Sequence, residues 1–369
     1  MYLNDGAISH TRLSLGQLDK TRVYRHYKTS MRKNTQILLS VVIIVILGVG
    51  IVGKLSKSPE DREVVVYVSH DQDYAEPVLK EFETKTGILV KAVYDTEASK
   101  TVGLTNRLIA EKENPTADVF WNNEVTHTIQ LKQEGVLDTY KPVRFDDIPD
   151  FAKDADGYWT GFAARARVLL VSNNSKIPER LEDLVGETYA QNVSVADARF
   201  GTTGSHVAAL WVVWGEEKTK EYLLNLTQQG LNVAQSNGQT RDKVVSGEKT
   251  IAFTDSDDAN DAISQGDNVT MVYPNQNDIG TLIIPNTVAL IKNAPHRDEA
   301  KELISFLISP EVESLLAYAK SAQMPLLPDV KKPDSVTSVM DIVAMNVDWN
   351  DIYAAYEPAV RFFTDEILK

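Results

Sequence analysis

Small polar and charged side chains follow the apolar, strand-like stretches of this sequence, at the points where those stretches end. The residues of this kind are Ser69, His70, Asp71, Asn122, Asn123, Glu124, Thr202, Thr203, Gly204, Ser205, Ser236, Asn237, Asp255, Ser256, Asp257 and Asp258. Two arginines, Arg165 and Arg167, lie in a separate extended stretch. Because ligands of open α/β sheets bind beyond the carboxyl ends of the strands, we expect these side chains to line one ligand site.

The segment Gly201–Ser205 (GTTGS) is the best candidate for holding an anion. It places hydroxyl groups and two glycines directly before a predicted helix, where free backbone N–H groups and the helix dipole attract negative charge. The alternative is that the Ser, Thr, Asp and Asn side chains of these loops only cap the helices that follow. The repetition of such loops along one predicted sheet edge favours a ligand site.

The sequence shows weaker patterns for catalysis than for ligand binding. His70 and Asp71 are neighbours in the chain, and neighbouring side chains rarely face each other. The nucleophile-elbow, zinc-protease and P-loop motifs do not occur. The run Asp255–Asp258 (DSDD) lacks the glycine and distal glutamate of a calcium loop, although it can supply hard oxygen ligands or bind an ammonium group. A hydrolase or lyase that uses His70 or Glu124 is therefore the less favoured alternative.

Strand-like and helix-like stretches alternate along the chain and position these loops. The predicted strands are 63–69, 88–94, 118–121, 193–196, 231–234, 250–254 and 269–273. The predicted helices are a stretch with Ala75, Val78, Leu79 and Phe82 on one face, followed by 100–113, 124–134, 204–214, 219–229, 238–246 and 257–264. Two further helical stripes meet at Ser309-Pro310, a helix cap followed by proline at the first helical position. The alternation predicts an α/β fold with a parallel sheet covered by helices on both faces.

The order of these elements predicts two lobes. We expect lobe 1 to comprise about 63–163 plus about 280–335, lobe 2 to comprise about 165–276, and the C-terminal segment to pack on either lobe. Because no long linker separates the lobes, the chain should cross between them on short extended segments. This organisation predicts a hinged central cleft with the two arginines near the crossing.

Composition and charge exclude several classes of function. The chain has 369 residues, of which 43% are apolar, and no cysteine; disulfides, cysteine-ligated metals and thiol nucleophiles are therefore excluded. Residues 1–36 carry seven basic and two acidic side chains, a net charge of +5, so the remainder carries −19 of the total of −14. Because so acidic a body repels phosphates, we expect no nucleic-acid partner.

The long uncharged run Ile37–Gly53 directly follows the basic segment 1–36. As a helix, its seventeen residues would span roughly 25 Å, close to the bilayer core of about 30 Å. The positive-inside rule places 1–36 in the cytoplasm and the main domain outside. We expect a single-pass transmembrane helix or uncleaved signal anchor at 37–53 and a linker at 54–62. A signal peptide cleaved on export to the periplasm and a buried core helix are the alternatives.

From about Glu63 onward, the chain resembles the extracellular solute-binding proteins of ABC importers, in particular their ferric-iron-binding branch, which has thiamine- and phosphonate-binding relatives. The resemblance lies in five stretches: VYVSHDQDYAEPVLKEFETKTGILVKAVYD, TADVFWNNEVTHTIQLKQEGVL, GFAARARVLLVSNN, FGTTGSH and IPNTVALIKNAPHRDEAKELISFLISPEVESLLA. It implies the two-lobed type II periplasmic-binding-protein fold and a binding protein rather than an enzyme. It also implies that the lobes close on a small ligand and deliver it to a membrane permease. The resemblance further implies a monomer that has no cofactor of its own.

By the same resemblance, the ligand contacts come from the candidate loops named above. One departure bears on the ligand. Ferric-binding relatives carry two consecutive tyrosines after the TIAF-like strand, and this chain has Asp255-Ser256-Asp257-Asp258 there. Carboxylates at Glu124 and Asp255 could hold Fe(III) as the transported ligand. They could instead pair with the amine of a phosphonate-like zwitterion whose anionic end binds the arginines and Gly201–Ser205. A membrane-anchored ligand sensor built on the same domain is the alternative function.

Overall fold

The computed structural model describes residues 62–70, 72–95 and 102–369. The predicted transmembrane segment 37–53, the basic segment before it and Asp71 lie outside these described residues. None of the described helices is long and apolar enough to cross a membrane. The described part of the chain belongs to one compact unit, Pro59–Lys369.

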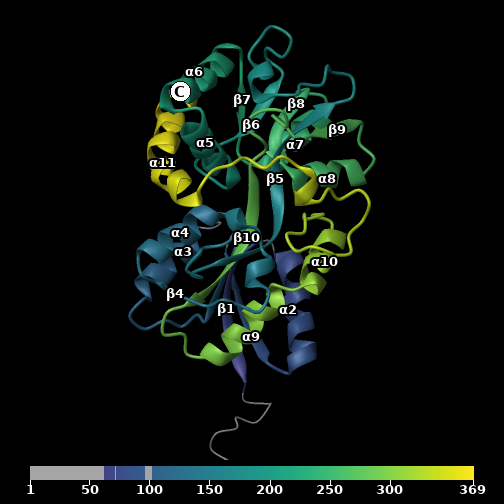
Figure 1. Cartoon of the computed structure of the whole chain (residues 1–369). Coiled ribbons are helices and arrows are strands. Elements are labelled where there is room, and N and C mark those ends of the chain that lie inside the picture. Colours follow the sequence, from purple (N-terminus) through teal and green to yellow (C-terminus); the bar gives the residue numbers. More distant parts are fainter. Residues whose placement is uncertain (1–61, 71, 96–101) are drawn as a thin grey trace, which may run out of the picture. The chain divides into compact units, whose positions relative to one another are not determined.

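A ten-stranded mixed sheet forms the centre of this unit (Figure 1). Its main path runs in the order β2-β1-β3-β10-β5-β8-β6-β7, with β4 paired to β10 and β9 paired to β5. The strands are β1 (Glu63–Ser69), β2 (Leu89–Tyr94), β3 (Val119–Asn122), β4 (Leu137–Asp138), β5 (Thr160–Ser172), β6 (Val193–Ala196), β7 (Asn232–Ala234), β8 (Ile251–Asp255), β9 (Val269–Val272) and β10 (Ile283–Ile291). The predicted strands are thus confirmed to within a few residues.

The expected all-parallel sheet is correct only for the outer strands. Strand β1 pairs in parallel with β2 and β3, and β6 pairs in parallel with β7 and β8. In the centre, β10 runs antiparallel to both β3 and β5, and β5 runs antiparallel to β8. The centre is antiparallel because its two strands carry the chain across the molecule in opposite directions.

Strand β5 is a single long strand rather than a short extended crossing. Its first half, up to Ala166, pairs with β10, and its second half, from Arg167, pairs with β8 and β9. The strand therefore joins two regions, which we call lobe 1 (around β1–β4) and lobe 2 (around β6–β9). The partner strand changes between Arg165 and Arg167, so both arginines lie at the junction of the lobes.

Helices flank the sheet in both lobes (Figure 1). They are α2 (Gln72–Thr86), α3 (Val102–Ala110), α4 (Val125–Gln133), α5 (Thr202–Val213), α6 (Glu216–Gln228), α7 (Asn237–Val245), α8 (Ser256–Ser264), α9 (Arg297–Leu307), α10 (Pro310–Tyr318) and α11 (Trp349–Phe362). Short 3₁₀ turns lie at η2 (Phe145–Asp147), η3 (Asp150–Ala152), η4 (Leu181–Leu184) and η5 (Val339–Asp341), and a π turn, η6 (Phe363–Ile367), follows α11. As predicted, Ser309 caps α10, and its hydroxyl accepts a hydrogen bond from the Val312 amide.

Two apolar cores lie on opposite faces of the sheet. In β5, Val168 and Leu170 belong to one core, whereas Leu169 and Val171 belong to the other. This division follows from the alternation of side chains along a strand. Both cores extend along β5 into the two lobes, so packing on both of its faces holds this strand, and the residues at the junction, in place.

The C-terminal helix α11 packs against both lobes. It contacts α5 of lobe 2 and α4 of lobe 1, and Figure 1 shows it in yellow beside α5 and next to α4. The indole N–H of Trp349, at its first turn, donates a hydrogen bond to the carbonyl of Phe151 at 3.0 Å. The sequence left the position of this segment open between the lobes.

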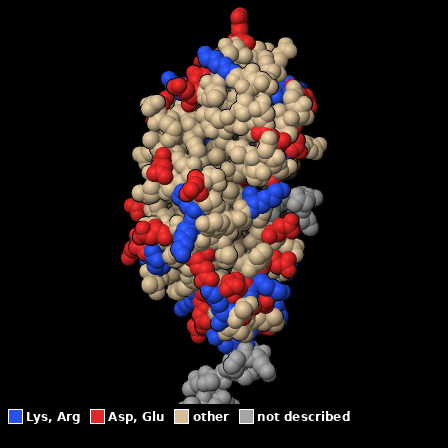
Figure 2. Space-filling model, turned by 90° about the vertical axis from the view of Figure 1, so that its right-hand side faces the viewer, with Lys and Arg blue, Asp and Glu red and all other residues tan. Residues whose placement is uncertain are grey.

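Charge is mixed on the surface that Figure 2 shows. On the described part of that face, Lys and Arg side chains lie among Asp and Glu, next to broad uncharged areas.

Candidate functional site

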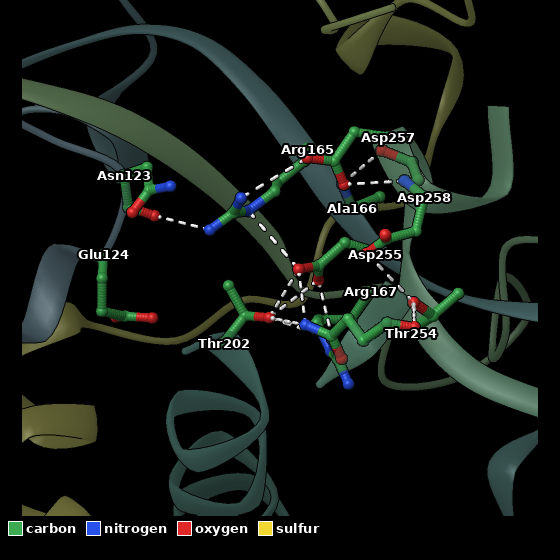
Figure 3. A network of polar contacts seen from close by, with 12 residues as sticks. Asn123, Glu124, Arg165, Ala166, Arg167, Thr202, Thr254, Asp255, Asp257 and Asp258 are labelled. Carbon is green, nitrogen blue, oxygen red and sulfur yellow. Dashed lines mark hydrogen bonds and ion pairs between the residues drawn. The ribbon is translucent and has the colours of Figure 1, made fainter. Parts of the chain in front are cut away.

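The candidate site lies at the junction of the lobes, where β5 meets the ends of β3 and β8 and the first turns of α4 and α5. Figure 3 shows Arg165 and Arg167 from β5, with Glu124 on one side and Asp255 and Asp257 on the other. The structure therefore brings together residues that are far apart in the sequence, as the strand-end argument predicted. The hydrogen bonds and ion pairs of each residue decide whether it holds the framework of the site together or can contact a ligand.

Arg167 forms a buried ion pair with Asp255. Its side chain has no exposed surface, and Nη1 lies 2.7 Å from Oδ1 of Asp255. The same nitrogen donates to the Thr202 hydroxyl at 3.0 Å and to the Asn237 side-chain carbonyl at 3.1 Å, and the guanidinium stacks over the Phe253 ring. A buried charge needs such partners because its desolvation costs several kcal/mol. Arg167 therefore belongs to the framework of lobe 2.

Asp255 uses both of its carboxylate oxygens within this framework. Besides Arg167, its Oδ2 accepts hydrogen bonds from the Thr202 hydroxyl at 2.7 Å and from the Asn237 amide at 2.9 Å. Burial raises the pKa of the Asp255 carboxyl, but Arg167 and Arg165 outweigh burial and hold this pKa below its ordinary value. Asp255 is therefore an ionised carboxylate with several hydrogen-bond and ion-pair partners.

Arg165 connects the two lobes. Its Nη2 donates to the backbone carbonyl of Asn123 in lobe 1 at 2.9 Å. Its Nη1 and Nε lie 3.5 Å and 3.6 Å from the carboxylates of Asp257 and Asp255 in lobe 2. Burial lowers the pKa of the guanidinium, but Asp255, Asp257 and Glu124 together raise it above its ordinary value. Arg165 is thus the positive charge at the centre of an acidic group.

Glu124 lies at the first turn of α4 and faces lobe 2. Its Oε1 caps α4 by accepting from the Thr126 amide at 3.2 Å, and it also accepts from the hydroxyl of Ser205, in α5, at 2.7 Å. The other oxygen, Oε2, is buried and has no hydrogen-bond partner in the part of the chain that the structure describes. The residue as a whole is only 1% exposed. A buried carboxylate oxygen without a partner is costly and is uncommon in folded proteins.

Three carboxylates of lobe 2 lie close together at the start of α8. One oxygen each of Asp255, Asp257 and Asp258 lies within 4.8 Å of the others. Burial, and then the charges of Asp257 and Asp255, raise the pKa of Asp258 well above its ordinary value. Arg241 approaches Asp258 at 3.8 Å. Arg241 and Arg165 offset part of the repulsion among these carboxylates.

The hydroxyls of the expected anion cradle contact protein groups. Thr202 bonds to Asp255 and Arg167, Thr203 lies 3.4 Å from Nη2 of Arg167, and Ser205 donates to Glu124. Gly204 leaves room for a neighbouring ring, because a Cβ there would lie 2.8 Å from Oη of Tyr356. The segment holds the side chains of the site in place.

Some predicted site residues point elsewhere. The Ser69 hydroxyl donates to Asp95 at 2.6 Å, and His70 contacts the Gln323 side chain at 2.8 Å. The Asn122 side chain bonds to the Glu124 carbonyl and to the Thr128 hydroxyl. These contacts lie within lobe 1.

Two predicted residues of lobe 2 take part in local hydrogen bonds. Ser236 is exposed and caps α7 by accepting from the Gln239 amide at 3.2 Å. The Ser256 hydroxyl accepts from the Ala166 amide at 3.0 Å and thereby ties α8 to β5. The Ser236 contact fits the helix-capping alternative, and the Ser256 contact is a packing contact between α8 and β5.

Two residues that were not predicted, His127 and Tyr356, lie next to each other near Glu124. His127 follows Glu124 by three residues, and burial lowers the pKa of its imidazole. Tyr356 comes from α11, and its ring centroid lies 6.3 Å from that of His127. Burial, and then the charge of Glu124, raise the pKa of the Tyr356 phenol. The i, i+3 spacing could have pointed to His127, but no sequence signal placed Tyr356 beside a residue more than 200 positions away.

Comparisons with known proteins show which proteins this chain is similar to. A family described as "Bacterial extracellular solute-binding protein" matches residues 114–355. The curated "Iron uptake protein A1" of Synechocystis sp. is 25% identical over 354 residues, covering 89% of this chain and 96% of that protein. The "Major ferric iron-binding protein" of Neisseria meningitidis is 24% identical over 306 residues, covering 79% and 88%.

Solved structures share the fold. Iron-bound HitA from Pseudomonas aeruginosa superposes with a TM-score of 0.73 at 22% identity, covering 82% of this chain and 99% of that one. The apo ferric ion-binding protein A of Pasteurella haemolytica gives a TM-score of 0.73 at 21% identity, covering 82% and 97%. The predicted two-lobed α/β periplasmic-binding fold is confirmed by this likeness.

Proposed function

This chain belongs to the family of bacterial extracellular solute-binding proteins, and we propose that it captures ferric iron outside the cytoplasm and delivers it to an ABC permease. The family is one of binding proteins, in agreement with the expected transport function rather than with a hydrolase or lyase. The observation that carries the choice of ligand is the buried, unpartnered Oε2 of Glu124 at the junction of the lobes. The two relatives named above, an iron uptake protein and a ferric iron-binding protein, point the same way.

The charge balance of the junction favours a hard cation. Glu124, Asp255 and Asp257 surround Arg165, whose raised guanidinium pKa reflects the charge of all three carboxylates. Carboxylate oxygens are the ligands that hard metal ions select. A cation bound at Oε2 of Glu124 would remove the cost of leaving this oxygen without a partner.

We assign the ligand role to Glu124 of lobe 1 and Asp257 of lobe 2. Asp257 is 19% exposed at its side chain, and Arg165 is its ion-pair partner. Asp255 is less suited as a ligand because Arg167, Thr202 and Asn237 already use its oxygens. In this proposal Arg165 is the counter-charge of the metal-free protein, and ferric iron competes with it for the same carboxylates.

Closure of the lobes follows from the same contacts. The Ser205–Glu124 and Arg165–Asn123 hydrogen bonds already join lobe 2 to lobe 1. A metal held by carboxylates of both lobes would stabilise this closed arrangement further, because its affinity for the closed state exceeds that for the open one. A permease could then distinguish the loaded protein from the empty one by its shape.

A phosphonate-like zwitterion is the second candidate, since Arg165 could bind its anionic end and the Asp257–Asp258 pair its amine. Against it, the hydroxyls of the Gly201–Ser205 segment are engaged with Arg167, Asp255 and Glu124. Native mass spectrometry of the purified protein separates the two, because bound iron adds the mass of the metal, with or without an accompanying anion, whereas a zwitterion adds an organic mass without iron.

The proposal is tested by titrating the full-length protein with Fe(III) supplied as ferric citrate. We expect saturable binding and a rise in melting temperature, which the Glu124→Gln variant should weaken by at least about tenfold, or ~1.4 kcal/mol. Glu134→Gln is the matched control, because Glu134 lies exposed at the other end of α4. If the wild-type protein gains no stability from ferric citrate, iron is not its ligand.

We further propose that residues 37–53 anchor the protein in the membrane as a single helix, with the binding domain outside. The uncharged run and the seven basic residues before it support this topology. Intact-mass measurement of the membrane-extracted protein tests it: a full-length mass supports the anchor, and a mass that begins after the apolar run supports a cleaved signal. A sensor role would require residues 1–36, so unchanged ligand-dependent regulation after their deletion would exclude it.

A further inference from the structure

The C-terminal helix α11 brings a phenol to the junction of the lobes. Tyr356 is half-buried between α5 of lobe 2 and α4 of lobe 1. Its hydroxyl lies 2.8 Å from the position that a Cβ of residue 204 would occupy, so the glycine in the first turn of α5 makes room for it. Tyr356 has no hydrogen bond to any residue that the structure describes.

Two groups on the first turn of α4 face the same space. The imidazole of His127 meets the ring of Tyr356 edge to face, at an interplanar angle of 65°. Glu124, three residues earlier, accepts a hydrogen bond from Ser205, which follows Gly204 in α5. Burial, and then the charge of Glu124, raise the pKa of the Tyr356 phenol. The buried Oε2 of Glu124 and the hydroxyl of Tyr356 thus lie in one neighbourhood and come from two different elements, and neither has a hydrogen-bond partner among the described residues.

We propose that Tyr356 is a further ligand of the metal ion held at Glu124, so that α11 supplies a third side of the site. This inference rests on the proposed function, since it assigns one more oxygen to the same ferric ion. The β8–α8 loop has no tyrosine, and α11 provides a phenol from another part of the fold. His127 is a positioning residue that holds the phenol ring by its edge.

The chemistry of the step is a ligand exchange coupled to loss of a proton. The phenol gives up its proton to solvent as the oxygen bonds to Fe(III), because metal ligands bind in their deprotonated form. A phenolate is a hard anionic oxygen donor, suited to a hard, highly charged ion. Charge transfer from phenolate to Fe(III) gives a visible absorption band that carboxylate ligands alone do not give.

The experiment measures the visible spectrum and the affinity of the full-length protein with ferric citrate. We expect the wild-type protein to develop a phenolate-to-iron band and the Tyr356→Phe variant to lose it, with at least about tenfold weaker binding. Tyr353→Phe is the matched control, because Tyr353 lies three residues earlier on α11 and the charges that act on it are those of Glu134 and Glu357. It should keep both the band and the affinity.

The possible failures are distinguishable. If the wild-type protein binds no Fe(III), the proposed function and the inference both fail. If it binds Fe(III) and Tyr356→Phe has unchanged spectrum and affinity, the inference alone is overturned. If a band persists in Tyr356→Phe, another tyrosine is the ligand and the assignment to α11 is wrong. Unchanged melting temperatures of the metal-free variants ensure that a loss of binding reflects the missing oxygen.

Discussion

Glu124 differs from Asp255 because one of its oxygens is buried without a partner, whereas Asp255 uses both of its oxygens. Sequence spacing treats them alike, since both follow a predicted strand and precede a helix. Only their neighbours separate a carboxylate that holds an arginine in place from one that can bind a cation. At the residue scale, the function of each acid is therefore decided by the hydrogen bonds that reach it.

The close contacts around Gly204 lead to a prediction at the residue scale. In Gly204→Ala, the added Cβ would meet the Tyr356 hydroxyl at 2.8 Å and the Ala198 carbonyl, so we expect a loss of about 1–3 kcal/mol in the free energy of unfolding. Urea denaturation measures it. Gly238→Ala is the control, because Gly238 lies in the first turn of α7 and a Cβ there meets nothing closer than 3.5 Å. Equal losses in both variants would contradict the steric explanation.

At the scale of elements, the buried face of α11 fixes the position of this helix. Ile352, Ala359 and, in the turn that follows, Phe363 have no exposed surface. Their side chains fill the space beside α5 and α6. This packing fixes the direction in which Tyr356 points, so the C-terminal helix positions part of the candidate site through apolar contacts that lie at a distance from it.

Phe363→Ala should therefore destabilise the protein strongly. Phe363 borders a small internal cavity of about 20 Å³ lined mainly by apolar side chains, and removing a buried phenylalanine costs about 3–5 kcal/mol, more where the void cannot collapse. Phe362→Ala is the comparison, because Phe362 is only half-buried beside Trp211. Thermal and urea denaturation should show the larger loss for Phe363; a larger loss for Phe362 would be inconsistent with the packing of α11.

At the scale of the whole binding domain, Arg165 links the lobes electrostatically. It joins the Asn123 carbonyl of lobe 1 to two carboxylates of lobe 2. If iron and Arg165 compete for these carboxylates, the metal-free protein depends on Arg165 more than the loaded protein does. The guanidinium then neutralises part of the negative charge at the junction as long as no metal ion is bound there.

We predict that Arg165→Gln lowers the free energy of unfolding of the metal-free protein by about 1–3 kcal/mol. Ferric citrate should raise the melting temperature of this variant more than that of the wild-type protein, because a competing cation has been removed. Calorimetry with and without ferric citrate measures both effects. Arg180→Gln, which alters an exposed pairing with Glu182 and Asp278, should change neither; a smaller iron effect in Arg165→Gln would argue against competition.

Several features follow from the sequence alone. The alternation of apolar strands and amphipathic helices, the Ser309-Pro310 cap and the polar loops at strand ends are local patterns, set by residue periodicity and by the hydrogen-bonding needs of helix ends. They predicted the α/β elements and the group that contains Glu124, Arg165 and Asp255. The charge division between 1–36 and the remainder likewise needs no coordinates.

The tertiary structure alone decided which of these residues remain available for a ligand. Ser69, His70 and Ser256 bond within their own surroundings, and Asp255 is used by Arg167. Tyr356 lies beside His127 and Gly204 only because α11 packs across both lobes. The physical reason is that hydrogen bonding and burial depend on distances between segments far apart in the chain, and no local pattern of residues contains those distances.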